Sequence, residues 1–149
     1  MDAEVKDYTC TPVYKSIKDI IEDESINQEF KPEEKTFLGE LQKSMMIELL
    51  ISQMRPNISV FFHSTNNGEY VPFYGYNQLK ALIDYINNEY ELFRVDSLPE
   101  LTGKKFNQLP YVMRATLEKP IVECYFYDNL TVNELDFIRN NLIANGFNN

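Results

Sequence analysis

The sequence predicts a single α+β domain, in which a small mixed sheet of about four strands, one β-hairpin among them, packs with four helices. Three observations predict it. Apolar residues recur at helical spacing in several segments, two β-rich segments flank an Asn-Gly pair, and a third β-rich run follows later. The 149 residues, 44% hydrophobic and 25% charged, suffice for one self-supporting core. This mixture of elements favours helices packed on a sheet over a bundle or a sandwich.

The chain opens with an acidic arm and a helix, at residues 1–31 of a single domain that spans 1–149. Val13, Ile17 and Ile20 recur at helical spacing behind Pro12. This spacing predicts a short amphipathic helix from about residue 13 to Glu24.

A longer helix is predicted from about residue 33 to 54. Pro32 suits a first helical turn, and the acids after it favour the positive end of the helix dipole. Its inner stripe is expected to comprise Phe37, Leu38, Leu41, Met45, Leu49 and Ser52. Four further apolar residues widen that stripe: Met46, Ile47, Leu50 and Ile51. So wide an apolar face predicts the central helix of the core, which ends at Arg55-Pro56.

The clearest local signal is a hairpin. Residues 58–63 and 69–74 are rich in β-forming side chains, and Asn67-Gly68 lies between them. An Asn-Gly pair predicts a tight turn in which both residues adopt left-handed dihedrals. Pro72 lacks an N–H, so the second strand is expected to lie at an edge or to end there.

The remaining elements follow in order along the chain. A helix is predicted over residues 78–89, a short strand over 92–95, and a short helix over 111–117 within an irregular segment. Residues 121–127 are the strongest single strand. The last helix begins with the capping box of Thr131 and Glu134, and Asn145-Gly146 ends it. Its expected inner stripe consists of Val132, Leu135, Ile138 and Leu142.

The charge balance bears on partners. Fourteen Lys and Arg against 23 Asp and Glu give a net charge of −9, and residues 1–34 alone carry −6. A phosphate backbone or an anionic bilayer needs clustered cations, so nucleic-acid and membrane binding are disfavoured. The same field favours a basic protein partner, although a negative surface also simply keeps a protein soluble.

Compartment and origin are inferred from composition. No run of about 18 apolar residues occurs, and the acidic N-terminal sequence is unlike a signal peptide. Cys10 and Cys124 have no CxxC spacing and are expected to be reduced thiols, so we expect a cytoplasmic, intracellular protein. An excess of Asn, Ile, Lys, Tyr and Phe matches A/T-rich codons and favours a phage, viral or low-GC bacterial source.

Motifs for chemistry are missing, so we predict no cofactor, no metal site and no catalytic residue. One His and two Cys are too few for a structural zinc site, and the five glycines form neither a GxGxxG nor a P-loop pattern. Lys104-Lys105 beside Gly103 favours a solvated loop. His63 is the only histidine, and Glu123 near Tyr125 is explained by a half-exposed strand position.

The tyrosines favour an interface. Seven of them are expected to be too many for the interior, because buried phenols need partners: Tyr70, Tyr74, Tyr76, Tyr85, Tyr90, Tyr125 and Tyr127. Exposed tyrosines beside acids would suit a protein-binding surface, with a ligand pocket and an ordinary surface as the alternatives.

Three classes of function stay open. The favoured one is a non-enzymatic acidic protein-binding module, an adaptor, inhibitor or immunity-type antagonist of a basic protein partner. The alternatives are an assembly subunit that forms a homo-oligomer through the apolar face of residues 37–51, and an enzyme without a recognisable motif. The candidate partner-binding residues are Asp19, Glu22, Asp23, Glu24, Glu33 and Glu34.

Overall fold

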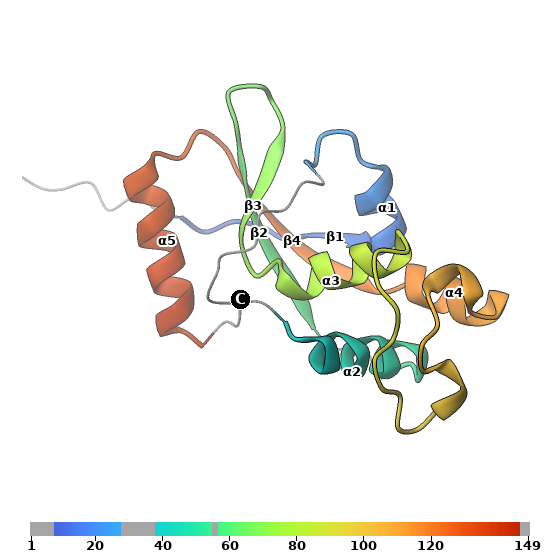
Figure 1. Cartoon of the computed structure of the whole chain (residues 1–149). Helices are drawn as coiled ribbons and strands as arrows, with labels where there is room; N and C mark the ends of the chain where they lie inside the picture. The colour runs from blue at the N-terminus through green and yellow to red at the C-terminus, as the bar shows by residue number, and fades with distance from the viewer. Residues whose placement is uncertain (1–7, 28–37, 55–56, 147–149) are drawn as a thin grey trace, which may run out of the picture.

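A four-stranded mixed sheet forms the centre of the protein (Figure 1). The computed structural model describes residues 8–27, 38–54 and 57–146. The strands are β1 (Val13–Ser16), β2 (Ile58–Ser64), β3 (Tyr70–Tyr74) and β4 (Ile121–Tyr127), in the order β1-β4-β2-β3. β2 and β4 run parallel, and both outer pairs are antiparallel. The predicted single α+β fold with a small mixed sheet is confirmed.

Five α-helices occur in the described residues, and four of them have eight residues or more. They are α1 (Ile17–Glu22), α2 (Glu40–Ile51), α3 (Asn77–Ile86), α4 (Tyr111–Glu118) and α5 (Val132–Ala144). Two short 3-10 helices, η1 (Pro99–Leu101) and η2 (Phe106–Gln108), lie between α3 and α4. None of the described helices has the length and apolar character needed to cross a membrane.

The two faces of the sheet are covered unequally. Alternate residues of β2 and β4, such as Val60, Phe62 and Cys124, point into a large core that α1 to α4 and the irregular segment complete. The opposite face carries a smaller cluster, in which Phe61 and Phe73 meet Ile138 of α5. Figure 1 shows α5 alone on one side of the sheet and the other helices on the opposite side and below.

The hairpin is confirmed, but its turn differs from the predicted one. Gly68 donates its N–H to Thr65 O (3.0 Å), and Thr65 donates to Glu69 O (2.8 Å). Gly68 has φ +77°, whereas Asn67 does not adopt a positive φ. A three-residue connection, with a turn followed by a single left-handed glycine, needs only one such residue. β3 lies at the edge of the sheet, as Pro72 predicted.

Two predictions about residues 1–54 are wrong. Val13–Ser16 form strand β1 rather than the first turn of a helix, because they pair antiparallel with β4 and the helix begins only at Ile17. The second helix begins at Glu40, after the non-helical Leu38 and Gly39, and ends at Ile51. The predicted helical residues 33–37 and the expected stop at Arg55-Pro56 lie outside the described residues.

Two further corrections concern later elements. Residues 92–95 form no strand; Leu92 instead bonds to the following loop, donating to Lys104 O and accepting from the Gly103 N–H. Leu92 and Val95 are buried, which explains the apolar pattern that suggested a strand. In α5, Val132 is 73% exposed and does not belong to the inner stripe, because the helix meets the sheet through Leu135, Ile138 and Leu142.

Candidate functional site

Of the predicted acidic residues that the structure describes, three are exposed and one is held by contacts within the protein. Asp19, Glu22 and Glu24 are exposed on and just after α1. Asp23 caps the end of that helix, accepts from the Ser25 hydroxyl (2.6 Å) and pairs with Lys15 (3.2 Å). The hydrogen bond from the Ser25 side chain, with further help from Lys15, lowers the pKa of Asp23. Glu33 and Glu34 lie outside the described residues.

The tyrosines do not form the expected exposed surface. Tyr74, Tyr76 and Tyr85 are buried. The other four are half-buried: Tyr70, Tyr90, Tyr125 and Tyr127. Hydroxyls of both groups have hydrogen-bond partners within the protein. The buried Tyr85 donates to Lys104 O (3.1 Å), and the half-buried Tyr90 donates to Ala81 O (2.6 Å). The prediction that these phenols are too numerous for the interior is therefore wrong.

An exposed apolar surface lies instead on α2. Leu41, Met45 and Leu49 repeat every four residues, are 41%, 51% and 41% exposed, and form what we call the α2 stripe. The side of α2 that enters the core carries Met46, Ile47 and Leu50. The predicted inner stripe of this helix, which includes Leu41, Met45 and Leu49, is therefore wrong, because the residues expected only to widen it are the buried ones. Both sides of α2 are apolar, so helical spacing alone does not tell which side is buried.

Charged residues of both signs lie around the α2 stripe, with Glu40, Lys43 and Lys105 lining one shallow pocket beside it. Glu40 and Glu48 flank it on the helix, and Glu48 accepts hydrogen bonds from both the N–H and the hydroxyl of Ser97. The single cation of α2, Lys43, places its ammonium 4.9 Å from the centre of the Tyr90 ring. Phe93, a further exposed apolar side chain, is fixed beside the helix because its N–H donates to Ser44 Oγ (2.8 Å).

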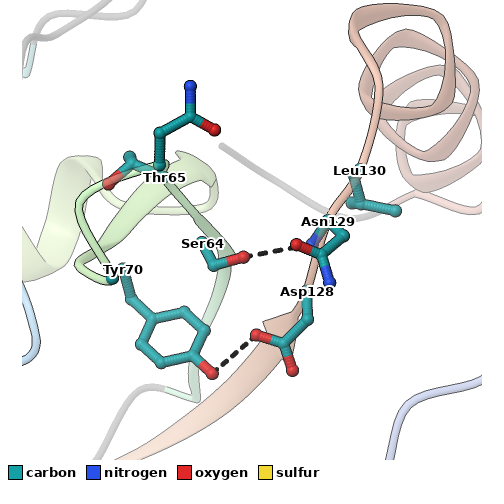
Figure 2. Close-up of a pocket in the computed structure, with 8 residues that line it drawn as sticks. Ser64, Thr65, Tyr70, Asp128, Asn129 and Leu130 are labelled. Atoms are coloured by element: carbon teal, nitrogen blue, oxygen red, sulfur yellow. Dashed lines mark hydrogen bonds between the residues drawn. The ribbon is translucent and has the colours of Figure 1, made fainter.

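A polar pocket of about 600 Å³ opens where the parallel strands β2 and β4 end (Figure 2). Carboxyl ends of parallel strands lie at the same edge of a sheet, which is where open α/β sheets commonly bind ligands. The lining comes from the hairpin turn and from the β4–α5 connection: Ser64, Thr65, Asn66, Gly68, Tyr70, Asp128, Asn129 and Leu130. We did not predict this pocket from the sequence; its one local signal is the polar Asp128-Asn129 that follows β4.

Two hydrogen bonds hold the walls of the polar pocket together. Tyr70 donates its hydroxyl to Asp128 Oδ1 (2.8 Å), and Asn129 donates its N–H to Ser64 Oγ (3.1 Å) (Figure 2). The bond to Asp128 also raises the pKa of Tyr70. Asn129 has φ +57°, an uncommon conformation that asparagine tolerates better than most residues. The pocket is thus preformed by contacts between distant segments.

His63 and Glu123, the two other groups considered from the sequence, lie at different positions of the sheet: His63 pairs with Tyr127, and Glu123 pairs with Ser59. His63 is half-buried, and burial lowers its pKa; its ring packs edge-on against Phe73 at 5.8 Å between centres. Glu123 accepts the hydroxyl of Tyr125 on the face of the sheet that α5 covers in part. Among the described residues, no group of three or more His, Cys, Asp or Glu side chains is placed to hold a metal ion.

Comparison with protein-family models, with curated proteins and with solved structures finds no match to this chain.

Proposed function

We propose that this protein is a non-enzymatic protein-binding module, and that it binds a basic protein partner through the α2 stripe. The observation that carries the proposal is the exposure of Leu41, Met45 and Leu49 in one row on a helix whose opposite side is buried. Apolar side chains aligned in this way fit the groove or helix face of a partner. Methionine at the centre suits such a surface, because its flexible thioether adapts to the shape it meets.

Charge favours a basic partner over a second copy of the chain. Each copy carries a net charge of −9, so two copies repel one another at long range. Glu40 and Glu48 beside the α2 stripe would meet cations at the rim of a basic partner. Two carboxylates against one lysine give α2 itself a net charge of −1, which has the same sign as the net charge of the chain.

The predicted acidic residues then act at a distance. Asp19 and Glu22 lie on α1, which packs on β1 and α4 and is a different helix from the one that carries the α2 stripe. The field of these carboxylates can speed the approach of a basic protein. We expect each of them to change the association rate modestly, and salt to screen the effect.

A synthetic amphipathic helix tests the α2 stripe directly. The probe is a peptide of about 18 residues, with Leu on one face and Lys on the other, titrated against the full chain by fluorescence anisotropy. Met45→Glu should weaken binding about tenfold, because it places a charge in the centre of the apolar row. The added negative charge alone would attract the basic peptide, so a loss of affinity reports the apolar contact.

Val132→Glu is the matched control, since it introduces the same charge at an exposed apolar residue of α5. Binding should be retained in this variant, and a peptide with Glu in place of Lys should not bind the parent. Equal affinity of the parent and Met45→Glu would contradict the proposal. So would a dimer in sedimentation that Met45→Glu abolishes while the peptide fails to bind, since that result identifies a homo-oligomer interface.

A further inference from the structure

The described residues that line the polar pocket offer both hydrogen-bond donors and acceptors, and none of them carries a positive charge. Ser64 Oγ accepts the Asn129 N–H, which leaves its own hydroxyl proton to donate. Asp128 uses Oδ1 to accept the Tyr70 hydroxyl, and Oδ2 takes part in no hydrogen bond among the described residues. The amides of Asn66 and Asn129 can each donate and accept. Tyr70 and Leu130 add a small apolar surface.

This lining excludes most classes of ligand. A phosphate or carboxylate needs a cation or converging N–H groups, whereas the described residues that line the pocket include no Lys, Arg or His and carry Asp128. A divalent metal ion favours several charged oxygen ligands, and the described lining supplies one carboxylate, already shared with Tyr70, beside neutral hydroxyl and amide oxygens. An apolar ligand would bury these polar groups without partners, which is unfavourable.

We infer that the polar pocket binds a neutral, hydroxyl-rich ligand with the size of one or two sugar rings. A sugar hydroxyl both donates and accepts, so neighbouring hydroxyls can pair with Asp128 Oδ2 and with the Asn129 amide at once. A volume of about 600 Å³ falls in the range typical of small-molecule sites. The walls are already joined by two hydrogen bonds, so little ordering accompanies binding. This inference does not depend on the α2 stripe.

A titration of the isotopically labelled full chain, followed by its amide NMR signals, tests the inference. The probes are glucose, galactose, mannose and N-acetylglucosamine, each added up to tens of millimolar, with inorganic phosphate and spermidine as charged comparisons. At least one sugar should shift the amide signals of residues 64–68 and 128–130 in a saturable manner. The signals of α2, about residues 40–51, should stay in place.

Two substitutions remove the binding groups while preserving the local fold. Asn129→Gly deletes the amide, and glycine adopts φ +57° without strain. Asp128→Asn keeps an oxygen that accepts the Tyr70 hydroxyl but loses the charge and the second acceptor. Each should raise the sugar dissociation constant at least tenfold. Asp96→Asn, which changes an exposed carboxylate paired with Arg94, is the matched control and should leave it unchanged.

Three outcomes would overturn the inference. The first is the absence of any saturable shift with the four sugars. The second is a response of the pocket amides to phosphate or spermidine when the sugars produce none, which would assign a charged ligand. The third is sugar binding that Asn129→Gly and Asp128→Asn leave unchanged although both variants fold, which would place the sugar elsewhere.

Discussion

At the scale of single residues, the two cysteines differ in how far their side chains are buried. The Cys124 side chain is 0% exposed in the large core, and this burial raises the pKa of its thiol to about 12. Cys10 is half-buried, and its thiol donates to Phe126 O (3.3 Å) near the surface. Because the thiolate is the reactive form, the two side chains should differ in reactivity.

We expect one thiol per chain to react with a disulfide reagent at about pH 8 in the folded protein, and both to react after unfolding. Cys10→Ser should abolish the labelling of the folded state, whereas Cys124→Ala should preserve it. The absorbance of the released thiol gives the count. Rapid labelling of the folded Cys10→Ser variant would show that Cys124 is accessible.

Two glycines adopt the same unusual backbone conformation for different structural reasons. Gly68 has φ +77° in the open hairpin turn, where an added Cβ meets no atom within 4 Å. Gly75 has φ +79° after β3, where an added Cβ would lie 2.2 Å from Ser59 O. Strain from the dihedral angle is common to both positions, but the clash with backbone occurs only at Gly75.

Gly68→Ala should therefore lower the free energy of unfolding by about 1 kcal/mol, because only left-handed strain is added. Gly75→Ala should cost at least about 3 kcal/mol, since β2 must also move away from the new methyl group. Urea unfolding of the two variants beside the parent measures both values. Equal losses would mean that the approach of Gly75 to Ser59 relaxes at little cost.

At the scale of elements, the capping box of α5 connects a local sequence signal to the covering of the sheet. Thr131 Oγ1 accepts the Glu134 N–H (3.2 Å), and Glu134 Oε1 accepts the Thr131 N–H (3.1 Å). The other carboxylate oxygen of Glu134 accepts the Tyr8 hydroxyl (3.0 Å). One side chain thus caps the helix and also fixes the segment before β1.

Thr131→Ala should lower the free energy of unfolding by about 1 kcal/mol, because it leaves the Glu134 N–H without its side-chain acceptor. Thr131→Ser keeps the hydroxyl and should lose less than half as much. Thermal unfolding followed by circular dichroism compares the variants. If the serine and alanine variants are equally destabilised, the lost methyl group, rather than the cap, accounts for the change.

Some elements of this fold are determined by residues close together in the sequence, and others by contacts with distant segments. The hairpin, the capping box and strand β4 depend on neighbouring residues, and all three could be predicted from the sequence. β1 could not, because its four residues become a strand only by pairing with β4 more than a hundred residues later. The same limit applies to the polar pocket, whose walls are the hairpin turn and the β4–α5 connection.

Which side of a helix is buried is likewise a tertiary property. On α3, Leu79, Leu82 and Ile83 recur at helical spacing and form one buried apolar side. On α2 two apolar sides compete, and contacts with α3 and α4 decide that Met46, Ile47 and Leu50 are buried. The fold class could thus be predicted, whereas the location of the α2 stripe needed the three-dimensional structure.

At the scale of the whole molecule, buried phenols and a buried thiol link stability to alkaline pH. Burial raises the pKa of Tyr85, Tyr90 and Cys124. The folded protein therefore keeps these protons at a pH where the unfolded chain, with ordinary pKa values, has lost them. The stabilising contribution is complete below about pH 8, where the unfolded thiol and phenols also keep their protons, and it declines as the pH rises further.

We expect the free energy of unfolding to fall above about pH 9 to 10, by up to about 1.4 kcal/mol per pH unit for each such group. Tyr90→Phe should reduce the dependence of the free energy of unfolding on pH by the contribution of one titrating group. Tyr111→Phe, which alters a side chain that is 75% exposed, is the control and should leave it unchanged. Urea unfolding at a series of alkaline pH values measures the slope, and a flat profile would be inconsistent with buried, protonated phenols.

The unequal faces of the sheet have a consequence for the motions of the folded protein. α5 is fixed by its cap and by the small cluster around Ile138, whereas the other helices share the large core with the sheet. Elements with few buried contacts open at a lower free energy than the whole molecule does. The amide protons of α5 should therefore exchange with deuterium through a local opening in which the sheet stays folded. In that opened state Phe61 and Tyr125, which stack with ring centres 4.5 Å apart, would face water for a small fraction of the time.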